Sequence, residues 1–385
     1  MSHPHPPPPG PVPEPADPQG APPQWTPAGQ PGWAPGAMPA AQPPAWGPAP
    51  PQHYGPPAGW TPVAPPVRPP ALPVVPREYH EFYRTPRFRW WRPLLALAMF
   101  GGSWFIVSLL GGLAVIGYEM AVGNLDPEAL LDGEIPTTPM LFLVNNLSLA
   151  LAIPLAWAAH RAVFGQGIGW LSSIAGRFRW GLFGRFTGFV LVCYLVWTAV
   201  EIAFSGLPEG LAIRPETWFL LVSVVLTTPL QAAGEEFALR GLGARAIGSW
   251  FPASRIGLVV STAITGVGFM LLHGAGDPWL NAFYLYFGVL ACVLTWRTGG
   301  LEAAIALHVV NNLAGLAWVP FTGIEGLFDR EAGVGDPAVL LQMAIVTLVA
   351  AGLLWLGSRA KLTQSAGPGV ALGTQGQAAA APDGE

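Results

Sequence analysis

The chain has 385 residues, of which 51% are hydrophobic and only 10% are charged. A soluble domain of this length rarely shows that balance, so the sequence predicts a polytopic membrane protein. A formal net charge of -4 gives no reason to expect nucleic-acid binding. Cys193 and Cys292 both fall in apolar segments, so we expect neither a disulfide framework nor a thiolate metal site.

Residues 1–76 contain more than half of the 44 prolines and, as charged residues, only Glu14, Asp17 and Arg68. Such a segment cannot bury a hydrophobic core, so we expect a disordered cytoplasmic tail with polyproline II character. Its tryptophans leave two interpretations open, a bland tether or an arm that binds a cytoplasmic partner. No charged region leads directly into an apolar stretch, so we do not interpret the tail as a secretory signal.

Residues 77–92 form a basic and aromatic strip that we expect to lie at anionic lipid headgroups. Apolar runs follow, each close to the roughly 20 residues that a helix needs to cross a bilayer. They cover residues 93–118, 140–160, 183–204, 217–239, 255–274, 279–296, 300–318 and 338–358. The sequence therefore predicts an all-α, polytopic transmembrane helix bundle of about eight spans at 93–361, followed by a disordered tail at 362–385.

Charge alternates between the loops that join these spans. The loops after the first and seventh spans are acidic, whereas those after the second, fourth and sixth spans are basic. By the positive-inside rule the basic loops face the cytoplasm, and an even number of spans with both termini inside satisfies every loop. Together with the Pro/Gly/Ala-rich composition, this pattern favours an integral protein of a bacterial plasma membrane.

Two adjacent glutamates, Glu235 and Glu236, lie at the end of the apolar run 217–239. Ionisable groups at membrane depth are costly, so such a pair indicates a functional site. In a helix, Glu236 and Arg240 are i,i+4 neighbours that can pair. Glu235 points about 100° away from them and stays available for chemistry. The alternative is a helix end at the membrane surface with an ordinary surface ion pair.

Two of the 7 histidines lie inside predicted spans. His273 shares a helix face with Phe269, and His308 shares one with Asn312, because the partners are four residues apart. A single membrane histidine is commonly a packing residue, but two of them beside a glutamate pair favour one convergent polar site. A carboxylate and a histidine can deprotonate water, and a second histidine with an amide can stabilise an oxyanion.

The same side chains could instead bind a metal. Two histidines and one glutamate match a catalytic zinc ligand set, so Glu235, His273 and His308 are candidate ligands of one divalent metal such as zinc. The sequence lacks the compact His-Glu-x-x-His arrangement, and the metal question stays open at this point. A proton-coupled transporter is a further alternative, although we find no pair of matching halves of the kind that many transporters contain.

Three motifs follow one another on successive predicted spans: Glu235-Glu236-x-x-x-Arg240, Phe269-x-x-x-His273 and His308-x-x-x-Asn312. In this order they resemble the CPBP family of intramembrane proteases. That family groups type II CAAX prenyl endopeptidases with bacteriocin-processing and bacteriocin-immunity proteins. The resemblance covers about residues 140–318.

The resemblance implies an all-helical fold with its site in a membrane cavity and a membrane-associated peptide or protein as substrate. It implies that Glu235 and His273 activate water, that His308 and Asn312 stabilise the oxyanion, and that the glutamate–arginine pair of the first motif is structural. Members are described both as metalloproteases and as metal-free glutamate proteases. A non-catalytic immunity or scaffolding protein of the same fold is the main alternative.

The predicted spans contain one geometric conflict. Drawn as straight helices, they place His273 near the outer end of its span, while Glu235 and His308 lie nearer the cytoplasmic side. Either the fourth span is long and tilted, or the fifth starts deeper than residue 255. We expect the boundary of the fifth span to be the error.

Overall fold

The computed structural model describes residues 69–131, 137–325, 327 and 330–367. These residues lie within one of the two units into which the chain divides, Pro66–Glu385. The predicted tail at 1–76 falls mostly outside the described residues, and so does the predicted C-terminal tail from residue 368 onward. The fold below is that of the described part of the chain.

Helices account for almost all of the regular structure in the described residues. In chain order they are η1 (Tyr79–Glu81), α1 (Trp91–Ala121), α2 (Pro127–Leu131), α3 (Pro139–Ala150), α4 (Ala152–Phe164), α5 (Ile168–Ser172), α6 (Trp180–Ser205), α7 (Thr217–Glu236), η2 (Phe237–Gly243), α8 (Ala244–Gly248), α9 (Ser254–Leu272), α10 (Pro278–Thr298), α11 (Glu302–Gly315), α12 (Val319–Thr322) and α13 (Val339–Arg359). Here η1 is a 3₁₀-helix and η2 is a π-helix.

Eight helical segments in the described residues are long and apolar enough to cross a membrane. They are Trp91–Ala121, Pro139–Phe164, Trp180–Ser205, Thr217–Gly248, Ser254–Leu272, Pro278–Thr298, Glu302–Thr322 and Val339–Arg359. Each overlaps one predicted span, so the prediction of an all-α bundle of about eight spans is confirmed. Three of these segments combine shorter elements, α3 with α4, α7 with η2 and α8, and α11 with α12.

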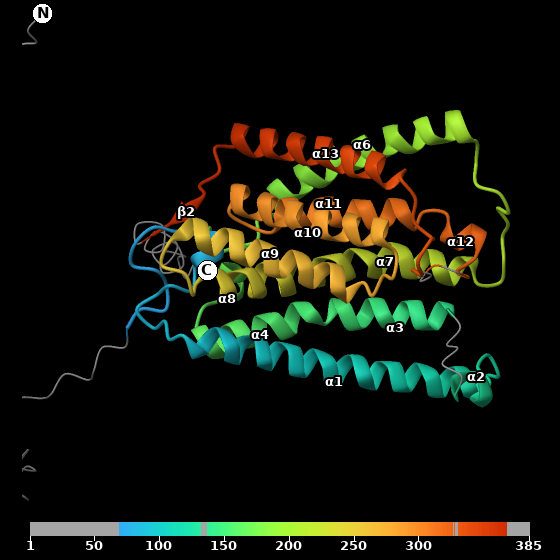
Figure 1. Cartoon of the computed structure of the whole chain (residues 1–385), viewed down its shortest axis with the longest axis horizontal. Coiled ribbons are helices and arrows are strands. Elements are labelled where there is room, and N and C mark those ends of the chain that lie inside the picture. Colours follow the sequence, from blue (N-terminus) through green and yellow to red (C-terminus); the bar gives the residue numbers. More distant parts are fainter. Residues whose placement is uncertain (1–68, 132–136, 326, 328–329, 368–385) are drawn as a thin grey trace, which may run out of the picture. The chain divides into compact units, whose positions relative to one another are not determined.

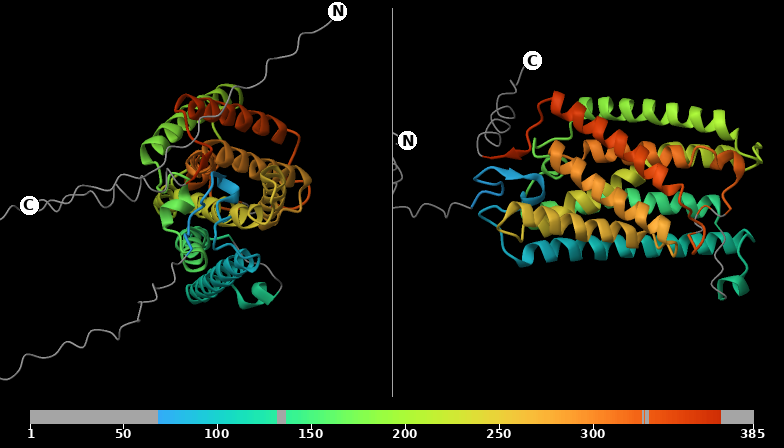
Figure 2. Two further views of the ribbon diagram at one scale, coloured as in Figure 1. Left: turned by 90° about the vertical axis from the view of Figure 1, so that its left-hand side faces the viewer. Right: turned by 45° about the horizontal axis from the view of Figure 1, so that its top comes forward.

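The helices lie side by side in a bundle, with α7, α9, α10 and α11 between two flanking groups (Figures 1 and 2). On one flank, α3 packs against α7, and α1 packs against α3 and α4. On the other flank, α6 packs against α11, and α13 packs against α10. α1 is the least buried span within the protein, and its outward side chains are apolar, as expected of a helix that faces lipid. The inner helices therefore hold the side chains that lipid does not reach.

Glycines allow the inner helices to approach one another closely. A Cβ atom on Gly234 of α7 would lie 2.0 Å from the carbonyl oxygen of Leu149 in α3. A Cβ atom on Gly288 of α10 would lie 3.0 Å from the Cα atom of Gly266 in α9. Small residues at such crossings are the usual means of helix association in membranes, where lipid removes the hydrophobic driving force. Both crossings lie next to the polar residues described below.

The predicted basic and aromatic strip at 77–92 contains a short strand and η1 and lies against the helix ends (Figure 2). Tyr79 and Tyr83 are almost fully buried, and the Arg245 guanidinium of α8 lies 3.7 Å from the Tyr79 ring centroid. Trp90, by contrast, is exposed. The aromatic residues at the start of the strip thus pack inward, whereas Trp90 near its end is exposed.

Two short strands, one near each end of the described residues, pair with each other. β1 (Arg77–Glu78) and β2 (Ser365–Ala366) form an antiparallel pair in which Arg77 faces Ala366 and Glu78 faces Ser365. β2 lies within the segment 362–385 that the sequence predicted to be disordered, so the first residues of that segment are part of the fold.

Candidate active site

The glutamate pair lies inside the fourth membrane segment, not at its end. α7 ends at Glu236, but the chain continues without a break through η2 and α8, which gives a helical segment of 32 residues from Thr217 to Gly248. The predicted end at residue 239 was therefore too early, whereas the fifth span begins at Ser254, one residue from its predicted start. A long fourth segment, not a misplaced fifth one, therefore moves Glu235 away from the cytoplasmic end of its helix, and it lines the same cavity as His273. π-Helices of this kind frequently occur at functional sites.

Glu236, Arg240 and His308 form a buried polar cluster. Arg240 Nη1 donates to Glu236 Oε1 over 3.0 Å, and Nη2 donates to the carbonyl oxygen of Gly288 over 3.0 Å. The side chains of Glu236 and Arg240 are both 0% exposed. His308 Nδ1 donates to the same Glu236 oxygen over 2.8 Å. Because the guanidinium neutralises the Glu236 carboxylate, the pair can remain charged inside the bundle.

Glu235 takes a different position from its neighbour and lines a cavity. Gln231, one helical turn earlier in α7, donates from Nε2 to Glu235 Oε1. His308 Nε2 lies 3.7 Å from Glu235 Oε2, which is too far for a hydrogen bond. The Glu235 side chain is 13% exposed. One carboxylate oxygen is thus held by Gln231, and the other lies near His308, which is buried behind the cavity wall.

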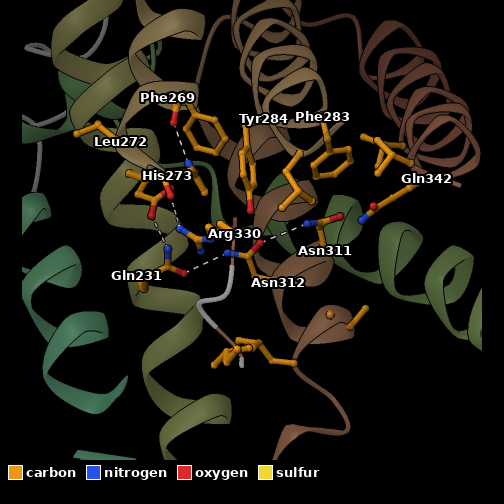
Figure 3. A pocket seen from close by; sticks show the side chains of 18 of the residues that line it. Gln231, Phe269, Leu272, His273, Phe283, Tyr284, Asn311, Asn312, Arg330 and Gln342 are labelled. Carbon is orange, nitrogen blue, oxygen red and sulfur yellow. Dashed lines mark hydrogen bonds between the residues drawn. The ribbon is translucent and has the colours of Figure 1, made fainter. Parts of the chain in front are cut away.

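His273 follows the last residue of α9 and also lines the cavity. Its Nδ1 donates to the carbonyl oxygen of Phe269 over 2.8 Å, and its ring stacks on Tyr284 with centroids 3.9 Å apart. Arg330 Nη1 donates to the carbonyl oxygen of His273 over 2.5 Å. Since a carbonyl oxygen only accepts, Nδ1 must be protonated, and the neutral ring keeps a lone pair on Nε2. Figure 3 shows this histidine held between Phe269, Tyr284 and Arg330.

Asn312 lies on the cavity wall, and its side chain is hydrogen-bonded to residues that the motifs did not include. Asn312 Nδ2 donates to Gln231 Oε1 over 3.2 Å, and Asn311 Nδ2 donates to Asn312 Oδ1 over 3.3 Å (Figure 3). Tyr194 of α6 donates to Asn311 Oδ1 over 2.8 Å. The sequence prediction missed Gln231, Asn311 and Tyr194. Gln231 alone had a signal, because it lies four residues before Glu235 in the same helix.

The cavity has a volume of about 1010 Å³ and is bounded by both flanks and the inner helices. Its wall includes aromatic and amide side chains from α1, α3, α6, α7, α9, α10, α11 and α13: Trp104, Asn145, Tyr194, Gln231, Phe269, Tyr284, Asn312 and Gln342. Of the predicted site residues, Glu235, His273 and Asn312 line it. The other three form the cluster directly behind Glu235. The predicted residues therefore converge, with three at the cavity surface and three supporting them.

The two histidines among the candidate metal ligands each use one ring nitrogen for another partner. His308 Nδ1 is bonded to Glu236, and His273 Nδ1 is bonded to a backbone carbonyl. Among the residues that the structure describes, no group of three or more His, Cys, Asp or Glu side chains is arranged to hold a metal ion. Catalytic zinc needs three protein ligands around an open position. We route no step of the reaction proposed below through a metal.

Fold and site together define a polytopic integral membrane protein with a carboxylate, a histidine and an amide on one cavity in its helix bundle. Residues 215–314, which contain all three motifs, match the protein-family model described as "Type II CAAX prenyl endopeptidase Rce1-like". This match confirms the resemblance that the motifs indicated. The chain is also 24% identical over 294 residues to the "Uncharacterized protein YyaK" of Bacillus subtilis (strain 168). The aligned residues cover 71% of this chain and 94% of that protein. No solved structure matches the chain.

Proposed function

We propose that this protein is an intramembrane endopeptidase that hydrolyses a peptide bond of a membrane-associated substrate. The observation that supports this function best is the position of Glu235 on the wall of the cavity that His273 and Asn312 also line. A water molecule in that cavity would have a carboxylate to accept its proton and a histidine to orient it. The match of residues 215–314 to an endopeptidase family model supports the same reaction class.

In the proposed reaction, Glu235 accepts a proton from a water molecule whose lone pair on oxygen attacks the carbonyl carbon of the scissile bond. His273 accepts a hydrogen bond from the same water at Nε2. The carbonyl oxygen becomes an oxyanion and takes a hydrogen bond from Asn312, which uses only one of its two amide hydrogens on Gln231. The carbon–nitrogen bond then breaks, and the proton held by Glu235 passes to the leaving nitrogen.

The position of His308 favours a role different from the oxyanion donor that the sequence suggested. Its ring lies between the two glutamates, with Nδ1 on Glu236 and Nε2 facing Glu235 Oε2. It is 2% exposed and lies behind the cavity wall. We therefore assign His308 to anchoring Glu236 through its Nδ1 hydrogen bond, and we keep Asn312 as the donor to the oxyanion.

We further propose that both chain ends face the cytoplasm of a bacterial cell. The end of the bundle that carries β1 and β2 also carries most of the described basic side chains: Arg161, Arg177, Arg179, Arg185, Arg245, Arg255, Arg297, Arg359 and Lys361. The opposite end is richer in acids, including Glu119, Asp126, Glu128 and Asp336. This asymmetry is the one that the positive-inside rule associates with a cytoplasmic face.

The decisive experiment is cleavage of a panel of membrane-anchored peptides by the detergent-purified protein. Glu235→Gln keeps the shape of the side chain but removes the base, so we expect cleavage to fall by at least about 100-fold. Glu201→Gln is the matched control, because Glu201 of α6 lines the same cavity and has no role in the proposed reaction. The control should cleave like the unaltered protein, and addition of a chelator should leave cleavage unchanged.

Other outcomes would support other functions. Full cleavage by Glu235→Gln would refute the proposed mechanism, and loss of cleavage on chelation would require a metal. If the unaltered protein cleaved nothing, and Glu235→Ala left the cellular phenotype unchanged, the immunity or scaffolding role would be favoured. Proton-driven flux in proteoliposomes would favour the transporter.

A further inference from the structure

A continuous line of hydrogen bonds crosses the cavity wall from α6 to the proposed base. Tyr194 donates to Asn311 Oδ1 over 2.8 Å, Asn311 donates to Asn312 Oδ1 over 3.3 Å, and Asn312 donates to Gln231 Oε1 over 3.2 Å. Gln231 then donates to Glu235 Oε1. The line connects three membrane segments, because Tyr194 belongs to α6, Asn311 and Asn312 to α11, and the last two residues to α7.

We infer that Tyr194, Asn311 and Gln231 are positioning residues, which fix Glu235 and Asn312 relative to each other through this hydrogen-bond chain. The inference rests on the proposed function, since it assigns supporting groups to the same site. It adds three residues that none of the three motifs specifies. It also gives a reason why a tyrosine of α6 should affect chemistry at a glutamate of α7.

The direction of the hydrogen-bond chain, from donor to acceptor at each step, follows from the chemistry of Glu235 at its end. An ionised carboxylate only accepts hydrogen bonds, so Gln231 must present its NH₂ group to Glu235 and its oxygen to Asn312. Asn312 must then present its own NH₂ group to Gln231, and the same reasoning fixes Asn311. The last free acceptor, Asn311 Oδ1, requires a donor, and the Tyr194 hydroxyl supplies it. A single charge at one end therefore sets the orientation of three amides and a hydroxyl.

Burial makes this orientation costly to lose. Tyr194 and Gln231 are each 8% exposed, and the two asparagines are half-buried. Hydrogen bonds are stronger and mutually reinforcing where water is scarce, and the bond to an ionised group is the strongest in the chain. Buried polar groups that lose a partner pay a desolvation cost, so an amide whose neighbour is removed tends to rotate to a new partner.

Two consequences for the reaction follow. Glu235 Oε1 is occupied by Gln231, so Oε2 is the oxygen left to take the proton from water. Asn312 holds Gln231 with one amide hydrogen, which leaves the second for the oxyanion. The chain thus sets the separation of base and oxyanion donor, and an error in that separation lowers the rate of the chemical step.

The test is a double-mutant cycle measured by steady-state cleavage. Tyr194→Phe removes one oxygen atom and should lower kcat by about threefold to tenfold with KM unchanged. Gln231→Leu removes the charge-assisted bond and should lower kcat by about tenfold to 100-fold. In the Gln231→Leu background, Tyr194→Phe should have no further effect, because the chain is already broken. Thr198→Val is the control, since Thr198 lies one turn from Tyr194 on the same cavity wall, and it should match the unaltered protein.

The inference is overturned if Tyr194→Phe and Gln231→Leu multiply their effects, if they raise KM alone, or if both match the unaltered protein. Those results differ from failure of the proposed function, which requires that Glu235→Gln keeps cleaving. Should Gln231→Leu fail to fold, Asn311→Asp replaces it, because this isosteric change puts an acceptor where a donor must face Asn312. Size-exclusion profiles of each variant confirm that the comparison concerns folded protein.

Discussion

Replacing Arg240 should destabilise the bundle far more than replacing an exposed arginine. Arg240 and Glu236 are both 0% exposed, and their atoms Nη1 and Oε1 lie 3.0 Å apart. Arg240→Met leaves the Glu236 carboxylate buried with only His308 to accompany it. Breaking one partner of a buried pair typically costs about 3–5 kcal/mol, because the remaining charge stays desolvated. Arg359→Met, at the exposed end of α13, should cost no more than about 0.5 kcal/mol.

The assay is equilibrium unfolding of the purified protein in mixed micelles, with the double variant Glu236→Gln plus Arg240→Met as the fourth corner of a cycle. The double variant removes both charges, so it should be more stable than Arg240→Met alone. The reasoning is refuted if Arg240→Met unfolds like the unaltered protein. It is equally refuted if the stability losses of the two single variants simply add.

Two further predictions concern packing and pH. Gly234→Ala should lower both stability and cleavage, because its Cβ atom would lie 2.0 Å from the Leu149 carbonyl oxygen, whereas Gly188→Ala has nothing within 4 Å and should be neutral. Equal thermal midpoints for the two variants would contradict this account. At the start of α10, the backbone N–H of Leu280 holds the pKa of Asp277 below its usual value of 3.8. The ionised Asp277 therefore contributes stability above pH 3.8, which is lost as the pH falls through the lower folded value. Asp277→Asn should be less stable than the unaltered protein at neutral pH, with a gap that narrows in acid, and a gap independent of pH would contradict the role.

Much of this fold was readable because the bilayer imposes a length on each apolar run. All eight segments overlap their predicted ranges, since lipid-exposed helices need continuous apolar sequence. The contact between Glu236 and Arg240 was also predictable, because i,i+4 spacing alone places the two side chains together. Convergence of the three motifs followed from their resemblance to a family, and the structure brings their residues to one cavity and its wall.

Other features depended on contacts between helices that no local pattern reports. The end of the fourth segment was misjudged because Arg240 and three glycines in 234–243 look like a membrane boundary. In the fold, Glu236 neutralises that arginine and the helix continues. Tyr194 gave no signal at all, because its partner Asn311 is 117 residues away and the two meet only through the packing of α6 on α11.

The strand pair at the ends of the described chain has a practical consequence for how this protein can be labelled. Neighbouring strands lie about 4.8 Å apart, so the positions just before Arg77 and just after Ala366 are close together in the folded protein. Two fragments of a split reporter, fused there by short linkers in place of the natural ends, would meet at an effective concentration on the order of millimolar. Their signal would report whether a single copy of the chain is folded, with no need for a substrate.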